Sequence, residues 1–192
     1  MLSSVRRAVS WGIDYVQIRE KDLTDRDLFL LTGKVLKLVK GTNCRVLVNG
    51  RADLALAAGA HGVHLPATGI SIGELCSWLP RDFLVGVSVH SLAEARFAAA
   101  EGAHYLLLGP IFPTLSKLRL GSPLGVTSFH RICSELTIPI IGLGGIQPRM
   151  VPLVLKAGAS GIAGISMFQE DLFARQISRE ELAQFGDSLL SG

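Results

Sequence analysis

The sequence contains little cysteine, and the cysteines it has follow no recognisable pattern. Cys44, Cys76 and Cys133 are scattered over 192 residues, odd in number and without a spacing typical of metal ligands. Small secreted domains depend on paired cysteines, whereas cytoplasmic proteins keep their thiols reduced. We therefore expect reduced thiols in a cytoplasmic protein, either in its core or at its surface.

Long apolar runs and a strong charge of one sign are also missing. The most apolar stretch, residues 54–73, is interrupted by glycine, histidine and proline, so we interpret it as a helix, a strand and a loop. Residues at the start of the chain do not resemble a secretory signal peptide. The net charge of +3 is too small and too dispersed for nucleic-acid binding. We expect neither a membrane nor a nucleic acid as a partner.

The chain also lacks low-complexity tracts and shifts in composition that would mark a domain boundary. Its 192 residues are enough for one complete core, so we expect a single domain over residues 1–192. Hydrophobic residues make up 48% of the chain, a high share for a protein without membrane spans. Parallel strands buried on both faces explain this share, because such strands are continuously apolar.

One local pattern recurs along the chain. A glycine ends a predicted helix, and two connecting residues separate it from an apolar strand, at Gly12, Gly59, Gly102 and Gly158. Glycine at this place stops a helix in the left-handed conformation. Repetition of the same helix–glycine–strand unit predicts an α/β barrel of similar modules rather than an open sheet.

The predicted elements alternate regularly. Strands are expected at 15–19, 45–49, 62–65, 84–88, 105–108, 139–143 and 161–165. Helices are expected at 3–11, 25–39, 52–58, 71–78, 92–100, 128–136, 150–157 and 179–190. A barrel of this type has eight strands, so we predict an α/β fold, a (β/α)8 TIM barrel that lacks its first strand. The long connection at 109–127 is predicted to be a functional lid.

Glycine-rich stretches follow the last two predicted strands. Residues 140–146 and 161–166 each resemble a buried strand that runs into glycines or a serine. Glycines allow backbone N–H groups to approach an anion closely, and a helix that starts there adds its positive end. The last two strands carry the usual phosphate site of the barrel fold. The alternative is that these glycines only close tight turns; otherwise the ligand is a phosphorylated small molecule.

Functional side chains of such a barrel lie just beyond the carboxyl ends of the strands. The candidates at these places are Gln17, Arg19, Glu20, Lys21, Asn49, His64, Ser88, His90, Thr114, Ser116 and Lys117. The cations among them, near glycine-containing loops, are expected to meet one anionic ligand. A histidine within a barrel strand is more often a hydrogen-bonded core residue than an acid–base catalyst.

Six motifs in order give the chain a family resemblance. They are YVQIREKD at 15–22, VNGRADLA at 48–55, GVHL at 62–65, VGVSVH at 85–90, GPIFPT at 109–114 and GLGGI at 142–146. Together they closely resemble the thiamine phosphate synthase family, including its TenI (thiazole tautomerase) branch. The resemblance covers about residues 10–170. It implies a (β/α)8 barrel that handles thiazole phosphate, and for a synthase also a hydroxymethylpyrimidine diphosphate, which loses pyrophosphate in the coupling.

The resemblance also implies roles for individual residues. Arg19, Lys21 and Lys117 match catalytic cations that contact the diphosphate, and Asn49 and Ser88 match further diphosphate contacts. Gln17 matches a pyrimidine contact, while Thr114 and Ser116 fit the lid. Gly144, Gly145, Ile165 and Ser166 match the phosphate site for the thiazole substrate.

The chain departs from the family at its metal and acid–base positions. The two aspartates that hold Mg²⁺ in the synthases correspond here to Gly50 and about Gly69. Hard cations need oxygen ligands, so we assign no metal ligand, although Mg²⁺ is the family's cofactor. The forms around Gly50 and Pro66 resemble the tautomerase branch, which needs no metal. The candidate histidine of that branch corresponds to Pro110, which offers no proton-transferring group.

Three interpretations stay open on this evidence. The chain is a synthase or a tautomerase of the thiamine pathway, or a binding barrel that keeps the thiazole phosphate site without the chemistry. A different phosphate-handling enzyme, such as an epimerase, disagrees with the ordered motifs. A seam between the first and last strands would be an edge for pairing with another copy, so a homo-oligomer is also an expectation.

Overall fold

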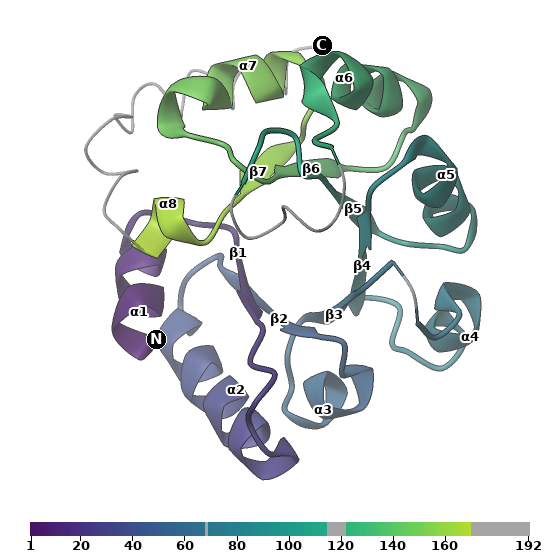
Figure 1. Cartoon of the computed structure of the whole chain (residues 1–192). Coiled ribbons are helices and arrows are strands. Elements are labelled where there is room, and N and C mark those ends of the chain that lie inside the picture. The colour runs from purple at the N-terminus through teal and green to yellow at the C-terminus, as the bar shows by residue number, and fades with distance from the viewer. Residues whose placement is uncertain (68, 115–121, 170–192) are drawn as a thin grey trace.

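Seven parallel strands pair in chain order from β1 to β7 and curl around a common axis, with the helices on the outside (Figure 1). The computed structural model describes residues 1–67, 69–114 and 122–169. The strands are β1 (Tyr15–Ile18), β2 (Arg45–Asn49), β3 (Gly62–Leu65), β4 (Leu84–Val89), β5 (Tyr105–Leu108), β6 (Ile140–Leu143) and β7 (Gly161–Ala163). This arrangement confirms the predicted α/β barrel class, and β1 and β7 are the two ends of the described sheet.

Helices connect the strands and cover the outer face of the sheet (Figure 1). They are α1 (Leu2–Ser10), α2 (Asp25–Val39), α3 (Ala52–Ala57), α4 (Ile72–Cys76), α5 (Leu92–Ala100), α6 (Gly125–Glu135), the 3-10 helix η2 (Pro148–Met150), α7 (Val151–Lys156) and α8 (Ser166–Gln169). Hydroxyl side chains begin several of them. Thr24, Ser71 and Ser91 each accept a hydrogen bond from the backbone N–H three residues later, which satisfies a free donor of the first turn.

The hydrophobic core lies between the sheet and the helices. Val46, Val63 and Val85 on neighbouring strands are fully buried, and Val35 of α2 and Phe129 of α6 are buried from the helix side. Successive side chains of a strand point to opposite faces, so every second residue of each strand enters this layer. Burial of this alternating set fixes the register of the strands, because a slip of one residue would bring polar side chains into the core.

The remaining residues of each strand face the inside of the curled sheet. Asn49 pairs with His64, His64 with Gly86, and Gly86 with Tyr105, so this row crosses β2, β3, β4 and β5. Ser88 lies on the same side of β4 as Gly86, two residues closer to the carboxyl end. The inner face therefore carries polar groups at its carboxyl half, where the barrel fold places its functional site.

The recurring glycines have the predicted function. Gly12, Gly59, Gly102 and Gly158 have φ angles of 80°, 74°, 96° and 101°, and each follows the end of a helix. Residues other than glycine rarely adopt this left-handed backbone conformation. The glycine is thus required by the turn that leads each helix back into the sheet.

Some predicted boundaries were wrong. The strand expected at 161–165 ends at Ala163, because Ser166 already starts the short helix α8. Helix α6 begins at Gly125 rather than at 128, and the N–H of Gly125 donates to the carbonyl of Ile111. Neither α8 nor η2 was expected. The helix expected at 179–190 lies outside the described residues, as does part of the predicted lid.

Residues 54–73 contain most of α3, all of β3 and a loop, as expected, and also the first two residues of α4. Among the helices of the described ranges, none has the length and apolar character needed to cross a bilayer. Cys44 is buried, Cys76 and Cys133 are partly buried, and all three are free thiols.

A glycine substitution tests the packing between β3 and β4. A Cβ atom at Gly62 would lie 2.3 Å from the carbonyl oxygen of Leu84, so Gly62→Ala forces the two strands apart. We expect this variant to lose about 1–3 kcal/mol of unfolding free energy in urea titrations. The control is Gly33→Ala within α2, where a Cβ meets nothing within 4 Å and should stabilise the helix by about 0.5–1 kcal/mol. Equal stability of the two variants would contradict the close packing of β3 against β4 at Gly62.

Candidate functional site

The carboxyl ends of β1 and β2 bring three predicted residues together. Nε2 of Gln17 donates to Oδ1 of Asn49 over 3.0 Å, which links the two strands on the inner face. Because the Asn49 carbonyl accepts this bond, its NH₂ group is left to donate elsewhere. Arg19 follows directly after β1, as predicted.

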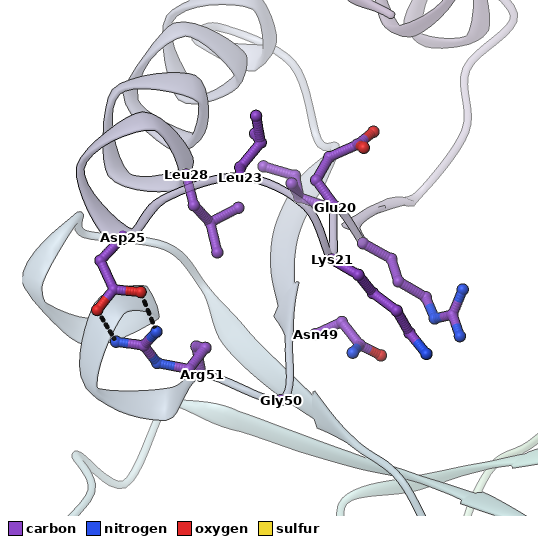
Figure 2. A pocket seen from close by; sticks show the side chains of 10 residues that line it. Glu20, Lys21, Leu23, Asp25, Leu28, Asn49, Gly50 and Arg51 are labelled. Carbon is purple, nitrogen blue, oxygen red and sulfur yellow. Dashed lines mark hydrogen bonds and ion pairs between the residues drawn. The ribbon is translucent and has the colours of Figure 1, made fainter.

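A cleft of about 290 Å³ lies at these strand ends (Figure 2). It is lined by Ile18, Arg19, Glu20, Lys21, Leu23, Asp25, Leu28, Asn49, Gly50 and Arg51. Lys21 and Asn49 extend toward the same side of the cleft. Neither Arg19 nor Lys21 has an ion-pair partner among the described residues. These two cations are therefore available to an anion that enters the cleft.

Arg51, by contrast, is occupied. Its guanidinium bonds both carboxylate oxygens of Asp25 at the start of α2, and it reaches Asp53 of α3 through Nε at 3.0 Å and Nη2 at 2.9 Å. The hydrogen bonds from Arg51 lower the pKa of Asp25 and the pKa of Asp53. The ion pairs join the first turns of two helices at the edge of the cleft (Figure 2). Asp25 lines the cleft, but its oxygens are already used by Arg51.

The residues at the cleft do not fit an Mg²⁺ ion. Gly50 and Gly69, which the resemblance matches to the metal-binding aspartates of the family, have no side-chain oxygen. Asp25 is bound to Arg51, so Glu20 is the one lining carboxylate without such a pair in the described part of the chain. The described ranges contain no cluster of three or more His, Cys, Asp or Glu side chains. A divalent cation needs several protein oxygens, or water in their place.

The inner face also carries a buried histidine with two polar partners. His64 is 1% exposed, its Nε2 lies 2.9 Å from Oγ of Ser88, and its Nδ1 lies 2.9 Å from the hydroxyl of Tyr105. Burial lowers the pKa of His64 to about 4, so the imidazole is neutral near pH 7. The predicted contact residue Ser88 is thus half-buried and held by His64. The sequence reasoning missed Tyr105, although a glycine inside a strand, Gly86, signals close approach of another group.

The other candidate histidine is also held structurally. Nδ1 of His90 bonds the carbonyl of Gly109, and its backbone N–H donates to Oε2 of Glu94 over 2.7 Å. Pro110, which the resemblance matches to the tautomerase histidine, lies next to Gly144. Both His64 and His90 are therefore hydrogen-bonded parts of the fold, as the sequence-based preference for core histidines predicts.

The glycines after β6 support close packing. Gly144 and Gly145 have φ angles of 97° and 67°, and a Cβ at Gly145 would lie 2.6 Å from the carbonyl oxygen of Pro113. A Cβ at Gly144 would lie 2.6 Å from Cβ of Pro110. The segment after β5 thus needs both glycines whether or not a phosphate binds. Their phosphate-binding role stays a prediction.

The other predicted residues are less defined. Ile165 follows β7 and is 69% exposed, and Ser166 is the first residue of α8. Thr114 is half-buried beyond β5. Ser116 and Lys117 lie outside the described residues.

Comparisons with known proteins show the family of this chain. A model of thiamine monophosphate synthase matches residues 1–168. The thiamine-phosphate synthase of Methanoculleus marisnigri is 40% identical over 161 residues, covering 84% of this chain and 76% of that protein. The Moorella thermoacetica synthase is 38% identical over 165 residues, covering 86% and 79%. The solved thiamine phosphate pyrophosphorylase from Pyrococcus furiosus superposes with a TM-score of 0.84 at 30% identity, covering 99% of this chain and 91% of that one.

The buried histidine predicts how stability depends on pH. Its pKa of about 4 in the folded state lies below the ordinary 6.5, so only the unfolded chain gains a proton as the pH falls from 6.5 toward 4. The contribution of His64 to the unfolding free energy is therefore fully kept above pH 6.5. About 3 kcal/mol of it is lost by pH 4, because only the unfolded chain binds the proton. We expect His64→Gln to flatten this part of the curve in urea titrations at several pH values. A stability curve for His64→Gln that runs parallel to the wild-type curve would contradict the assignment.

The Arg51 ion pairs give a second pH prediction. Because Arg51 lowers the pKa values of Asp25 and Asp53, their stabilising effect is present above the ordinary carboxyl pKa and lost as the pH falls through the lowered values. We expect Arg51→Gln to raise both pKa values in a carboxyl NMR titration. Arg26→Gln removes a neighbouring exposed charge that forms no ion pair in the described ranges and serves as the control. Unchanged pKa values in Arg51→Gln would show that the ion pairs do not form.

Proposed function

This chain belongs to the thiamine monophosphate synthase family, and we propose that it joins a pyrimidine diphosphate to thiazole phosphate and releases pyrophosphate. The observation that carries the proposal is the cleft at the ends of β1 and β2, where Arg19 and Lys21 are unpaired beside Asn49. Relatives of 38–40% identity named as thiamine-phosphate synthases support the same activity. The family membership confirms the resemblance seen in the sequence motifs.

The proposed reaction exchanges one bond to the pyrimidine methylene carbon for another. The bond from this carbon to the diphosphate oxygen breaks, and the leaving pyrophosphate keeps the electron pair. The thiazole nitrogen then supplies the pair for the new carbon–nitrogen bond. Negative charge grows on the leaving group, so cations and fixed donors at that place lower the barrier.

The residues of the cleft can stabilise the negative charge on the leaving pyrophosphate. Arg19 and Lys21 supply two positive groups to the lining of the cleft. The side-chain carbonyl of Asn49 is occupied by Gln17, which leaves the NH₂ group of Asn49 to donate to a ligand. Gln17 is proposed to contact the pyrimidine as well. Ser88, on the same inner face, is proposed as a further donor to the diphosphate.

The second substrate is assigned to the other side of the barrel. We place its phosphate at the backbone of Gly144 and Gly145 after β6 and of Ile165 and Ser166 after β7. These strands end at the same rim as β1 and β2, because the sheet is parallel throughout. From the resemblance, Thr114 and Ser116 are proposed to contact the substrates, and Lys117 is proposed to act on the diphosphate.

Two alternatives remain as outcomes of experiment. Glycines at the metal positions favour a barrel that binds thiazole phosphate without efficient coupling. Tautomerisation is less favoured, because Pro110 replaces the family histidine and both nearby histidines are engaged. No step is assigned to Mg²⁺, since the cleft residues do not fit its ligand requirements.

Two further expectations accompany the proposal. We propose a cytoplasmic location, supported by the three free thiols. We also propose a homo-oligomer, supported by β1 and β7, which are the two ends of the described sheet and offer edges for pairing.

A coupled assay tests the function. The purified chain with hydroxymethylpyrimidine diphosphate, thiazole phosphate and Mg²⁺ should form thiamine phosphate, read by fluorescence after oxidation. Arg19→Gln and Lys21→Gln should each lower kcat/KM by about 10²–10³-fold, because each removes a charge that stabilises the leaving group. Arg26→Gln, outside the cleft, is the matched control and should retain the wild-type value.

The negative outcomes are informative. Absence of product, together with calorimetric binding of thiazole phosphate, would identify a non-catalytic binding barrel. A large gain in pyrophosphate affinity on addition of Mg²⁺ would contradict the conclusion that the cleft lacks metal ligands.

A further inference from the structure

Tyr105, His64 and Ser88 form a hydrogen-bonded chain across the inside of β5, β3 and β4. We propose that Tyr105 and His64 are positioning residues that hold the Ser88 hydroxyl as a hydrogen-bond donor toward the diphosphate. This inference rests on the proposed function, because it concerns the same diphosphate site. It extends that site to a tyrosine that neither the motifs nor the comparisons assign.

The register of the strands brings Tyr105, His64 and Ser88 together. His64 of β3 pairs with Gly86 of β4, and Gly86 pairs with Tyr105 of β5, so the two side chains face one another across a residue without a side chain. A Cβ at Gly86 would lie 1.9 Å from Cζ of Tyr105. The tyrosine ring thus lies directly over the glycine, and its hydroxyl reaches Nδ1 of His64 at 2.9 Å.

The positions of the protons follow from the partners available. Burial raises the pKa of Tyr105, so its phenol keeps its proton. Within the described residues, Nδ1 of His64 is the only acceptor that this hydroxyl contacts. A neutral imidazole has one protonated nitrogen. If the phenol donates to Nδ1, the proton of His64 is on Nε2, and Nε2–H donates to Oγ of Ser88.

This arrangement leaves one hydrogen of Ser88 unused. Oγ of Ser88 accepts from His64, so its own O–H is free to donate to a ligand. Ser88 is half-buried and lies on β4 two residues beyond Gly86, toward the rim where Asn49 and Arg19 also lie. With the opposite tautomer, the Ser88 hydroxyl would donate its hydrogen to Nε2 and could present only lone pairs to an anion. The tyrosine hydroxyl therefore selects the tautomer that suits a negatively charged ligand.

The first experiment observes the tautomer itself. Two-bond ¹H–¹⁵N correlation spectra of the uniformly labelled full chain at pH 8 should show His64 protonated on Nε2. Tyr105→Phe keeps the ring over Gly86 but removes the hydroxyl, and it should shift His64 toward the Nδ1-protonated form or a mixture. His61 and His104 are references in the same spectrum, because backbone N–H groups of Val46 and Val85 donate to their Nδ1 atoms.

The matched control is the other tyrosine of the chain. The Tyr15 ring stacks on the Tyr105 ring with centroids 6.4 Å apart, yet its hydroxyl does not bond His64. Tyr15→Phe should leave the His64 spectrum unchanged. An unchanged tautomer in Tyr105→Phe, or Nδ1 protonation in the wild type, would overturn the proposal whatever the activity of the chain.

The second experiment measures whether Tyr105 and His64 affect ligand binding through Ser88. Calorimetry with inorganic pyrophosphate should show about a 10-fold or greater loss of affinity in Ser88→Ala, since a bond to a charged group is lost. We expect a smaller loss, about 3–10-fold, in Tyr105→Phe. The double variant should match Ser88→Ala alone, because Tyr105 has no other route to the ligand.

The outcomes separate this proposal from the proposed function. Additive losses in the double variant, or full affinity in Ser88→Ala or Tyr105→Phe, would overturn the positioning role while the synthase assay could still succeed. Conversely, a chain that forms no thiamine phosphate but shows the expected spectra and non-additive pyrophosphate binding would retain the Tyr105–His64–Ser88 arrangement in a binding barrel.

Discussion

Parallel pairing of the strands is the constraint on which the rest of this structure depends. Parallel strands in register bring all carboxyl ends to one rim and direct alternate residues to the helices or to the inside. Val46, Val63 and Val85 therefore pack beneath the helices, while Asn49 and Ser88 face inward. A shift of one residue on any strand would exchange these sets and place polar side chains in the core.

The same constraint explains why charge accumulates at one place. Arg19 and Lys21 follow β1. Because β1 pairs directly with β2, both residues line the same cleft as Asn49 at the end of β2. Two cations that line one cleft repel one another, and an isolated domain gains nothing from leaving them unpaired. Arg51, only slightly further away, is neutralised by Asp25 and Asp53. The contrast between paired and unpaired cations at one rim is the electrostatic basis for an anionic ligand.

Small residues serve the site indirectly. Gly86 allows the ring of Tyr105 to cross β4, and Gly144 and Gly145 allow the segment after β5 to pack against the end of β6. In each case the glycine makes room for another group of the protein. A glycine-rich motif is thus evidence of close approach, and the identity of the approaching group, backbone or phosphate, is a separate question.

The sequence by itself determined the fold class, the order of the strands and the family. Continuous apolar runs and recurring C-cap glycines depend on local chemistry, so they can be recognised along the chain. It also placed Gln17, Arg19, Lys21 and Asn49 at strand ends, where the structure brings them together. Only the tertiary structure showed that Arg51 binds Asp25 and that Tyr105 reaches His64. Those contacts join residues 26 and 41 positions apart, and strand register and curvature decide them rather than local sequence.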